Sequence, residues 1–374
     1  MLKNLLYTFL LVTISLSQLN GQVTSDKVVG KKNEALKDSL KSNPYPYILP
    51  IWGAKVAEKG YELPYSAGVS VNYMTQKSAL IMDNLQVGFN NGPMINLDEI
   101  VRFNESEAWA GALTVRPDVW VLPFLDVYAI MGQANTSTSI NAGVWLPDAN
   151  NTWREVTAFS TKAEFTAQTM GFGMTPTFGI GGGFMALDMN CAWSDVSSLE
   201  KPVFTFIFGP RVGKSFRLKK PQQSISAWVG GFRVHFASET KGSINLSEIM
   251  PPSELQTKVD NGIAKVGETQ VAVDNWWNSL TPKEQNNPVN EAKYNTANRV
   301  LDTAGNLFNS MDAALNDGES ATIQYSLDKA LKDKWNFVVG SQFQYNKHWM
   351  IRAEYGFLGS RTQFMGGLQY RFGL

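Results

Sequence analysis

The chain has 374 residues, which is enough for one large β-barrel or for two ordinary soluble domains. Its 33 lysines and arginines balance its 33 aspartates and glutamates, so no overall charge favours nucleic acid or an anionic membrane surface as a partner. The single cysteine, Cys191, excludes an internal disulfide and a thiolate metal cluster. Aromatic residues make up 12% of the chain and charged residues only 18%, which suits a protein whose surface meets lipid.

The first 21 residues predict an export signal. Lys3 supplies the positive start, residues 5–16 form the apolar stretch, and Gly21 precedes the preferred cleavage site. No cysteine follows this stretch, so a lipoprotein anchor is not indicated. Beyond it we find no apolar run long enough for a transmembrane helix. Residence in a membrane would therefore have to come from strands.

Residues 22–65 are expected to form a segment outside the main fold. Its start is polar, with a charge run at residues 31–38, and such runs are usually solvated. Residues 51–56 could form a short helix that occludes one mouth of the fold that follows. The charge run favours the other interpretation, a loosely tethered tail.

Many segments within residues 66–374 show a period-two alternation of apolar and polar side chains, as expected for strands, in which successive side chains point to opposite faces. In residues 184–195, for example, Leu187 and Trp193 share one face and Asp188 shares the other with asparagine and serine. Residues 79–89 also look extended and could bring the number of strands to twelve. Ten strands are predicted near residues 66–75, 108–121, 123–134, 163–180, 182–195, 201–216, 222–237, 334–345, 347–357 and 361–373.

The two faces of these strands differ too strongly for a soluble sandwich, whose apolar faces must pack against each other. Nearly every strand carries large apolar side chains on one face and glycine, amides or charges on the other. A membrane barrel accepts this pattern because its outer face meets hydrocarbon while its inner face can be polar. In residues 222–237 the pattern predicts that Trp228, Phe232, Val234 and Phe236 face lipid and that Gly231, Arg233 and His235 face the lumen.

A topology follows if the chain ends in the periplasm. The aromatic side chains then fall at two levels, as the girdles at the two membrane interfaces require. The N-terminal segment lies in the periplasm, and the long insert described next lies outside the cell. The periplasmic level contains Tyr345, Trp349, Tyr370 and Phe372, and the opposite level contains Trp193, Trp335 and Phe357.

The insert at residues 239–333 changes period. Apolar residues recur there at intervals of three and four, which predicts a helical seam. Asn287 and Pro288 are typical of a helix start, and Pro251 and Pro252 precede an earlier helix with a poorer seam. The insert therefore predicts an antiparallel helical hairpin: a surface decoration, a lid over the pore, or a partner-binding knob. The second seam is Tyr294, Ala297, Leu301, Ala304, Phe308, Met311 and Leu315.

Two stretches resemble those of Gram-negative outer-membrane barrel proteins, in particular uncharacterised porin-like ones. Residues 118–128 are similar to the downward strand, tight turn and upward strand of such barrels. The terminal run resembles the β-signal that these proteins present to the barrel-assembly machinery, although Gly373 and Leu374 follow its last aromatic residue. The resemblance implies an outer-membrane location, contact with its lipids and insertion by that machinery, but no substrate. The signal residues would be Phe364, Leu368, Tyr370 and Phe372.

The sequence offers little evidence for catalysis. It contains no phosphate loop, clustered histidine ligands or calcium loop, so we expect no metal and no cofactor. Of the two histidines, only His235 is predicted in the lumen, where Ser194, Ser226 or Asp195 could be its neighbours. A Ser–His hydrolase needs nucleophile and base within hydrogen-bond reach, but no motif selects a pair.

Charged side chains predicted inside the barrel are more informative. They could form an acidic and a larger basic side that orient a polar or anionic solute, or they could interlock and fill the interior. The favoured function is a passive porin-like channel for small polar solutes. The alternatives are a structural or adhesive barrel that presents the hairpin to a partner and an outer-membrane hydrolase that uses His235. The predicted lumen residues are Arg116, Asp118, Asp126, Asp188, Arg211, Arg217, Arg233, His235, Arg352, Glu354 and Arg371.

The predicted architecture is all-β. It is a transmembrane antiparallel up-and-down β-barrel of about 10–12 strands with an inserted extracellular α-helical hairpin. The expected division of the chain is a signal peptide at 1–21, a periplasmic segment at 22–65 and the barrel at 66–374, with its insert at 239–333.

Overall fold

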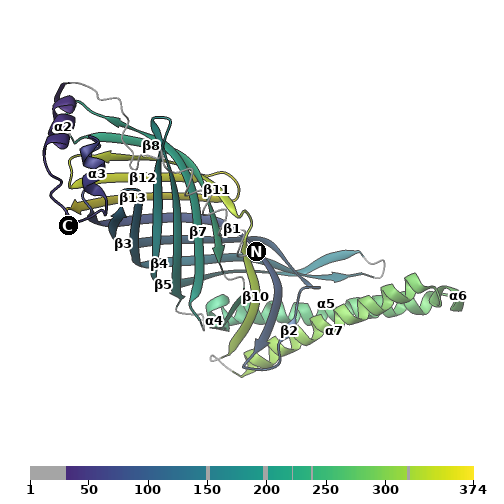
Figure 1. The fold of residues 1–374 in the computed structure, drawn as a ribbon. Coiled ribbons are helices and arrows are strands. Elements are labelled where there is room, and N and C mark those ends of the chain that lie inside the picture. Colours follow the sequence, from purple (N-terminus) through teal and green to yellow (C-terminus); the bar gives the residue numbers. More distant parts are fainter. Residues whose placement is uncertain (1–30, 149–151, 197–200, 221, 237–238, 318–320) are drawn as a thin grey trace.

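The computed structural model describes residues 31–374 except 149–151, 197–200, 221, 237–238 and 318–320. The predicted signal peptide lies outside the described residues. The chain forms a barrel, a strand extension at one end of it, and a pair of long helices that run outward from that extension (Figure 1).

Ten antiparallel strands make the barrel wall, and each pairs with its neighbour around the ring. The ring closes because β13 pairs with β1 from Ala67 opposite Phe372 to Ser78 opposite Arg361. Closure matters in hydrocarbon because it leaves no unpaired strand edge. The predicted all-β antiparallel barrel is confirmed, with ten strands in its wall. These are β1 (Ala67–Phe89), β3 (Val101–Leu122), β4 (Leu125–Pro147), β5 (Trp153–Ile180), β6 (Gly183–Val196), β7 (Val203–Arg217), β8 (Ser224–Phe236), β11 (Trp335–Gln344), β12 (Trp349–Phe357) and β13 (Arg361–Phe372).

The outer face of the wall is apolar and exposed. Phe172 and Ile351 are each 58% exposed, and Leu113 is 54% exposed. A continuous apolar surface of this extent would be an aggregation site in water, whereas hydrocarbon satisfies it. The barrel therefore faces lipid. Other exposed apolar side chains on this face include Val71, Tyr73, Met131, Met170, Val212, Val229, Phe343, Tyr355, Phe364 and Leu368.

Aromatic side chains gather at two levels, as predicted. Near the end with the short turns, the Trp349 and Tyr370 rings lie 4.9 Å apart. Towards the other end, Trp193 lies 5.2 Å from Phe204, and Phe357 contacts Phe337. Outer-membrane barrels place short turns in the periplasm and long loops outside. By this rule we expect the end that carries the chain termini of the barrel to be periplasmic and the insert between β8 and β11 to be extracellular.

Several strands are longer than a membrane requires. About 9–11 residues span the hydrocarbon, whereas β5 has 28 residues and β4 has 23. Residues 80–89 of β1 leave the barrel wall and pair with β10 (Thr322–Leu331), which pairs in turn with β9 (Glu239–Asn245). The short β2 (Ile95–Asn96) pairs with β1 as well. The two strands β9 and β10 lie inside the insert, where the sequence predicted only helices.

The insert contains α4 (Leu246–Ile249), α5 (Pro252–Ser279), α6 (Pro282–Gln285) and α7 (Pro288–Asn316). The start of α7 is the predicted one, since the Asn287 side chain accepts a hydrogen bond from the Val289 amide at 3.0 Å. At the tip, Thr281 and Glu284 form a capping box that begins α6. Helices α5 and α7 form the predicted antiparallel hairpin, and its tip at α6 lies farthest from the barrel (Figure 1). Within the described residues, no helix is long and apolar enough to span a membrane.

One apolar core holds the base of the hairpin to the strand extension. Phe308 and Val259 are fully buried, and they belong to the same cluster as Val144 and Leu146 of β4. Gly262 of α5 lies against the Phe308 ring, where a Cβ atom would clash with it. The helices therefore pack closely at this point, and the strands fix the direction of the hairpin.

Replacing Phe308 with alanine should loosen the hairpin without unfolding the barrel. Truncating a fully buried phenylalanine removes its packing and leaves a cavity, at a cost of about 3–5 kcal/mol. We expect faster proteolysis within residues 252–316 and a loss of helical circular dichroism at lower temperature. Val289→Ala is the control, since Val289 is 60% exposed on the same helix. Equal protease resistance of the two variants would contradict the shared core.

Candidate functional site

The N-terminal segment binds to the rim of the barrel at its periplasmic mouth. It contains α2 (Lys31–Ser42) and α3 (Gly53–Glu58). The Ile48 amide donates to the Leu374 carbonyl at 2.9 Å, and the Ile51 amide donates to the Val121 carbonyl at 2.9 Å. Glu62 forms ion pairs with Arg217 at 2.9 Å and with Lys347 at 3.4 Å. The favoured prediction of a loosely tethered tail is wrong for residues 48–66, which are bound to the rim.

Tyrosines explain why this segment binds although its start is highly charged. The Tyr47 ring lies 5.6 Å from the Tyr45 and Tyr65 rings, and Tyr65 lies 4.7 Å from His348 at the β11–β12 turn. Burial, and to a smaller degree the neighbouring Tyr47, raise the pKa of Tyr45 to about 12. The Tyr45 hydroxyl therefore remains protonated at ordinary pH and donates to the Leu49 carbonyl at 2.9 Å. The charge run that suggested a solvated tail lies before these tyrosines.

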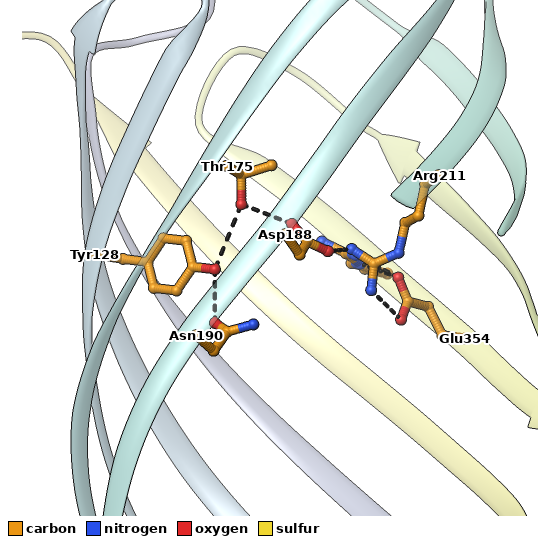
Figure 2. Close-up of polar contacts among 7 residues, drawn as sticks. Tyr128, Thr175, Asp188, Asn190, Arg211 and Glu354 are labelled. Carbon is orange, nitrogen blue, oxygen red and sulfur yellow. Dashed lines mark hydrogen bonds and ion pairs between the residues drawn. The ribbon is translucent and has the colours of Figure 1, made fainter. Parts of the chain in front are cut away.

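An ion-pair network crosses the lumen above this mouth (Figure 2). Arg211 of β7 contacts Asp188 of the neighbouring β6 and reaches Glu354 of β12 at 3.0 Å. Strands β7 and β12 are separated in the wall by β8 and β11, so Arg211 bridges well-separated parts of the ring. Arg352 donates from Nε to the other oxygen of Glu354 at 3.0 Å. Most of these side chains are largely buried, with Glu354 only 3% and Arg211 15% exposed.

Neutral side chains extend this network towards β4 and β5. Thr175 donates to Asp188 at 2.6 Å, and the Tyr128 hydroxyl donates to Asn190 at 2.7 Å. Figure 2 shows these groups directed towards one another from different strands. Buried charges are stable inside a protein when they form ion pairs, as Arg211, Asp188 and Glu354 do, whereas unpaired ones are costly. The network therefore fills this level of the interior with fixed side chains.

A second group lies lower, on β3 and β13. Asp118 accepts from Arg371 at 3.0 Å and from Gln369 at 2.8 and 3.0 Å. Arg371 also donates to the Tyr65 carbonyl at 2.9 Å, which joins the N-terminal segment to the barrel interior. On the adjoining part of the wall, Arg116 lies over the Tyr128 ring at 3.8 Å.

A cavity of about 280 Å³ lies between the N-terminal segment and the ion-pair network. Glu62, Leu63 and Pro64 line it on the periplasmic side. Nine of the eleven predicted lumen residues face the barrel interior, and eight of these line the cavity; the ninth, Glu354, lies in the network above it. In the described part of the chain, no group of histidine, cysteine, aspartate and glutamate side chains could hold a metal ion.

Arg233 and His235 do not face the lumen, so the prediction for them is wrong. Both are exposed, and Arg233 lies between the outward residues Phe208 and Trp335 in the sheet register. Trp228 and Phe232, predicted to face lipid, are each 7% exposed and lie inside. An arginine near a membrane interface costs only about 0–1 kcal/mol, far less than at the midplane. The outward position of Arg233 at the extracellular girdle is therefore tolerated.

Glycines on the neighbouring strands explain the inverted faces of β8. Trp228 pairs with Gly213 of β7 and with Gly340 of β11, and a Cβ atom at either glycine would clash with it. The missing side chains provide the space that an indole needs inside a narrow barrel. This signal is present in the sequence, but it requires the strand register to be known.

The alternative hydrolase site is not assembled. Ser226 lies inside and shares a hydrogen bond with Ser215 at 2.6 Å. Ser194 also points inward and pairs with Thr169 at 2.8 Å. His235 lies on the outer face, so neither serine can use it as a base. Sequence reasoning missed Glu62, Tyr128 and Thr175, whose roles depend on partners far along the chain.

Comparisons with known proteins do not assign the chain to a family. No family model matches the chain, and no curated protein matches its sequence. The TM-scores of the similar solved structures are too low to establish a shared fold. The closed strand pairing and the lipid-facing outer surface identify a membrane barrel without them. The protein is an outer-membrane β-barrel. Similar solved structures include the transport unit of the autotransporter AIDA-I from Escherichia coli (7% identity, covering 93% of this chain and 100% of that chain, TM-score 0.31), the translocator domain of the autotransporter NalP from Neisseria meningitidis (8% identity, 82% and 89%, TM-score 0.29) and a Pseudomonas aeruginosa FadL homologue (6% identity, 82% and 90%, TM-score 0.27).

Replacing Arg211 with methionine should destabilise the barrel strongly. The change preserves most of the side-chain volume but leaves Asp188 buried without its ion-pair partner, and breaking a buried pair costs about 3–5 kcal/mol. We expect a lower urea midpoint for unfolding from lipid vesicles, and adding Asp188→Asn should recover part of the loss.

Lys162→Gln provides the matched control. It breaks an ion pair with Glu164 in which the side chains are 59% and 70% exposed, and such pairs contribute about 0–1 kcal/mol. If Arg211→Met unfolded at the same urea concentration as Lys162→Gln, the network would not stabilise the interior.

Proposed function

We propose that the protein is an outer-membrane anchor that presents its helical hairpin to a protein partner outside the cell. The observation that carries this proposal is the apolar core shared by the hairpin and the strand extension. Leu301 and Phe308 of α7 belong to the same buried cluster as Phe89 of β1 and Leu146 of β4. A decorative loop would need only contacts between its own halves, whereas this core fixes the hairpin relative to the barrel.

Polar contacts support the same fixed orientation. Lys258 of α5 donates to the Ala158 carbonyl of β5 at 2.7 Å. Arg299 of α7 forms a two-point contact with Glu99, at 2.9 and 3.1 Å. These contacts lie on both helices, so neither helix can swing alone. A rigid support reduces the entropy lost on binding, which favours recognition of a partner.

The distal half of the hairpin provides a surface for that partner. Val271 and Val289 are each 60% exposed. Trp277 stacks on Tyr294 at 4.4 Å, next to Trp276. Aromatic side chains on a rigid support are typical of the residues that dominate protein interfaces.

A second candidate is passive passage of small polar or anionic solutes, favoured by the arginine-lined cavity of about 280 Å³. This candidate requires Arg211 to leave Asp188 and Glu354 so that a path opens through the network. A barrel of ten strands has an interior that side chains can fill. We rank the anchor first because the observed interior is bridged, and the two candidates differ in whether ions cross the unaltered barrel.

A photo-crosslinking amino acid at position 271 or 289 should form a discrete adduct with the partner on intact cells. Both positions are exposed on the distal half of the hairpin. The same amino acid at position 154 should form no such adduct, although the Arg154 side chain is 74% exposed on the strand extension. The measurement is a mass shift of the full-length protein on a denaturing gel after irradiation.

Val271→Asp tests whether the adduct depends on the apolar surface. We expect it to reduce the adduct formed from position 289 at least tenfold, since a charge at an interface core removes burial and adds a desolvation cost. Absence of adducts from both hairpin positions, in a protein that retains heat-resistant barrel migration, would contradict the proposal.

A further inference from the structure

Two opposite charges line the periplasmic cavity without touching each other. Arg116 of β3 and Asp126 of β4 both face the cavity. Within the described residues, Asp126 Oδ1 and Arg116 Nε are buried and have no hydrogen-bond partner. Buried polar atoms are nearly always paired, and a buried charge without a partner is especially costly. A charged side chain of each sign therefore lines this cavity without an ion-pair partner among the described residues.

Asp118 and Arg371 on this part of the wall are paired with each other, although Arg371 Nη2 is also buried without a hydrogen-bond partner. Asp118 is held by Arg371 and by Gln369. Arg371 is held a second time by the Tyr65 carbonyl. These groups form a fixed, closed arrangement beside Arg116 and Asp126. Arg116 and Asp126 form no ion pair within the described residues, so a ligand in the cavity could supply an anionic group to Arg116 and a cationic group to Asp126.

The arginine is fixed in position for binding. Its guanidinium lies 3.8 Å from the centre of the Tyr128 ring, and Tyr128 is itself held by its hydrogen bond to Asn190. A guanidinium on an aromatic face keeps its edge N–H groups free for a carboxylate. The volume of about 280 Å³ suits a ligand smaller than the drug-sized molecules that fill pockets of about 300–1,000 Å³.

We propose that this cavity binds a small zwitterion of the amino-acid class, with its carboxylate at Arg116 and its ammonium group at Asp126. Glu62, Leu63 and Pro64 line the cavity on the periplasmic side, so a ligand that arrives from the periplasm has to pass them. The ion pairs of Glu62 with Arg217 and Lys347 hold these residues in place. The site is independent of the hairpin and of its partner.

Calorimetric titration of the refolded protein, in detergent micelles, tests the proposal with three matched probes. L-alanine carries both charges, propionate lacks the ammonium group, and ethylammonium lacks the carboxylate. We expect L-alanine to bind at least tenfold more tightly than either single-charge probe. No binding of L-alanine at millimolar concentration, or equal binding of propionate, would overturn the proposal.

Substitutions locate the site. Arg116→Gln and Asp126→Asn should each weaken L-alanine binding at least tenfold, while Lys162→Gln, on the exposed strand extension, should leave it unchanged. Unchanged binding in both folded site variants would place the ligand elsewhere and overturn the assignment. If either variant fails to fold, the comparison of the three probes on the unaltered protein still decides the question.

Discussion

The closure of ten strands in hydrocarbon is the constraint on which the rest of this molecule depends. Every backbone N–H and C=O group in the wall must pair with a neighbouring strand, so β13 has to meet β1. A ring of this size leaves an interior that side chains can bridge. Arg211 does so by contacting β6 and β12 at once. The charges that could have oriented a passing solute instead hold the wall together.

The same strands also determine what the protein presents outside the cell. Because β4 and β5 continue well beyond the length needed to cross the membrane, they provide an apolar surface above the barrel. Residues 80–89 of β1 leave the wall and recruit β10 and β9 on the other side. The base of the hairpin packs into this extension, so its orientation depends on the register of membrane strands far from its tip.

The period-two pattern was sufficient to predict the barrel, its ten strands and its aromatic levels, because lipid imposes a strict choice between faces. The pattern failed at β8, where both faces of the strand carry large or charged side chains. There, Gly213 and Gly340 on the neighbouring strands decide which face of β8 points into the lumen. Those glycines act only through neighbouring strands. The helical seam of α7 was likewise visible in the sequence, whereas β9 and β10 were not, since they are short and polar.

Most lumen residues could be assigned from alternation alone, but their partners could not. The contact of Arg211 with Glu354 joins residues 143 positions apart, and that of Arg217 with Glu62 joins residues 155 positions apart. Such pairs follow from strand order and register. The binding of the N-terminal segment was missed for the same reason, because Tyr65 is anchored by β13 and Glu62 is anchored by the end of β7 and by the turn after β11.

The most direct test of this account is the conductance of the refolded mature protein in a planar lipid bilayer, with insertion confirmed by heat-resistant migration of the same preparation. A lumen bridged by Arg211 and covered by the N-terminal segment should show no stepwise conductance. Reproducible conductance steps from the unaltered protein would show that ions pass the network and would contradict the interpretation of the barrel as an anchor.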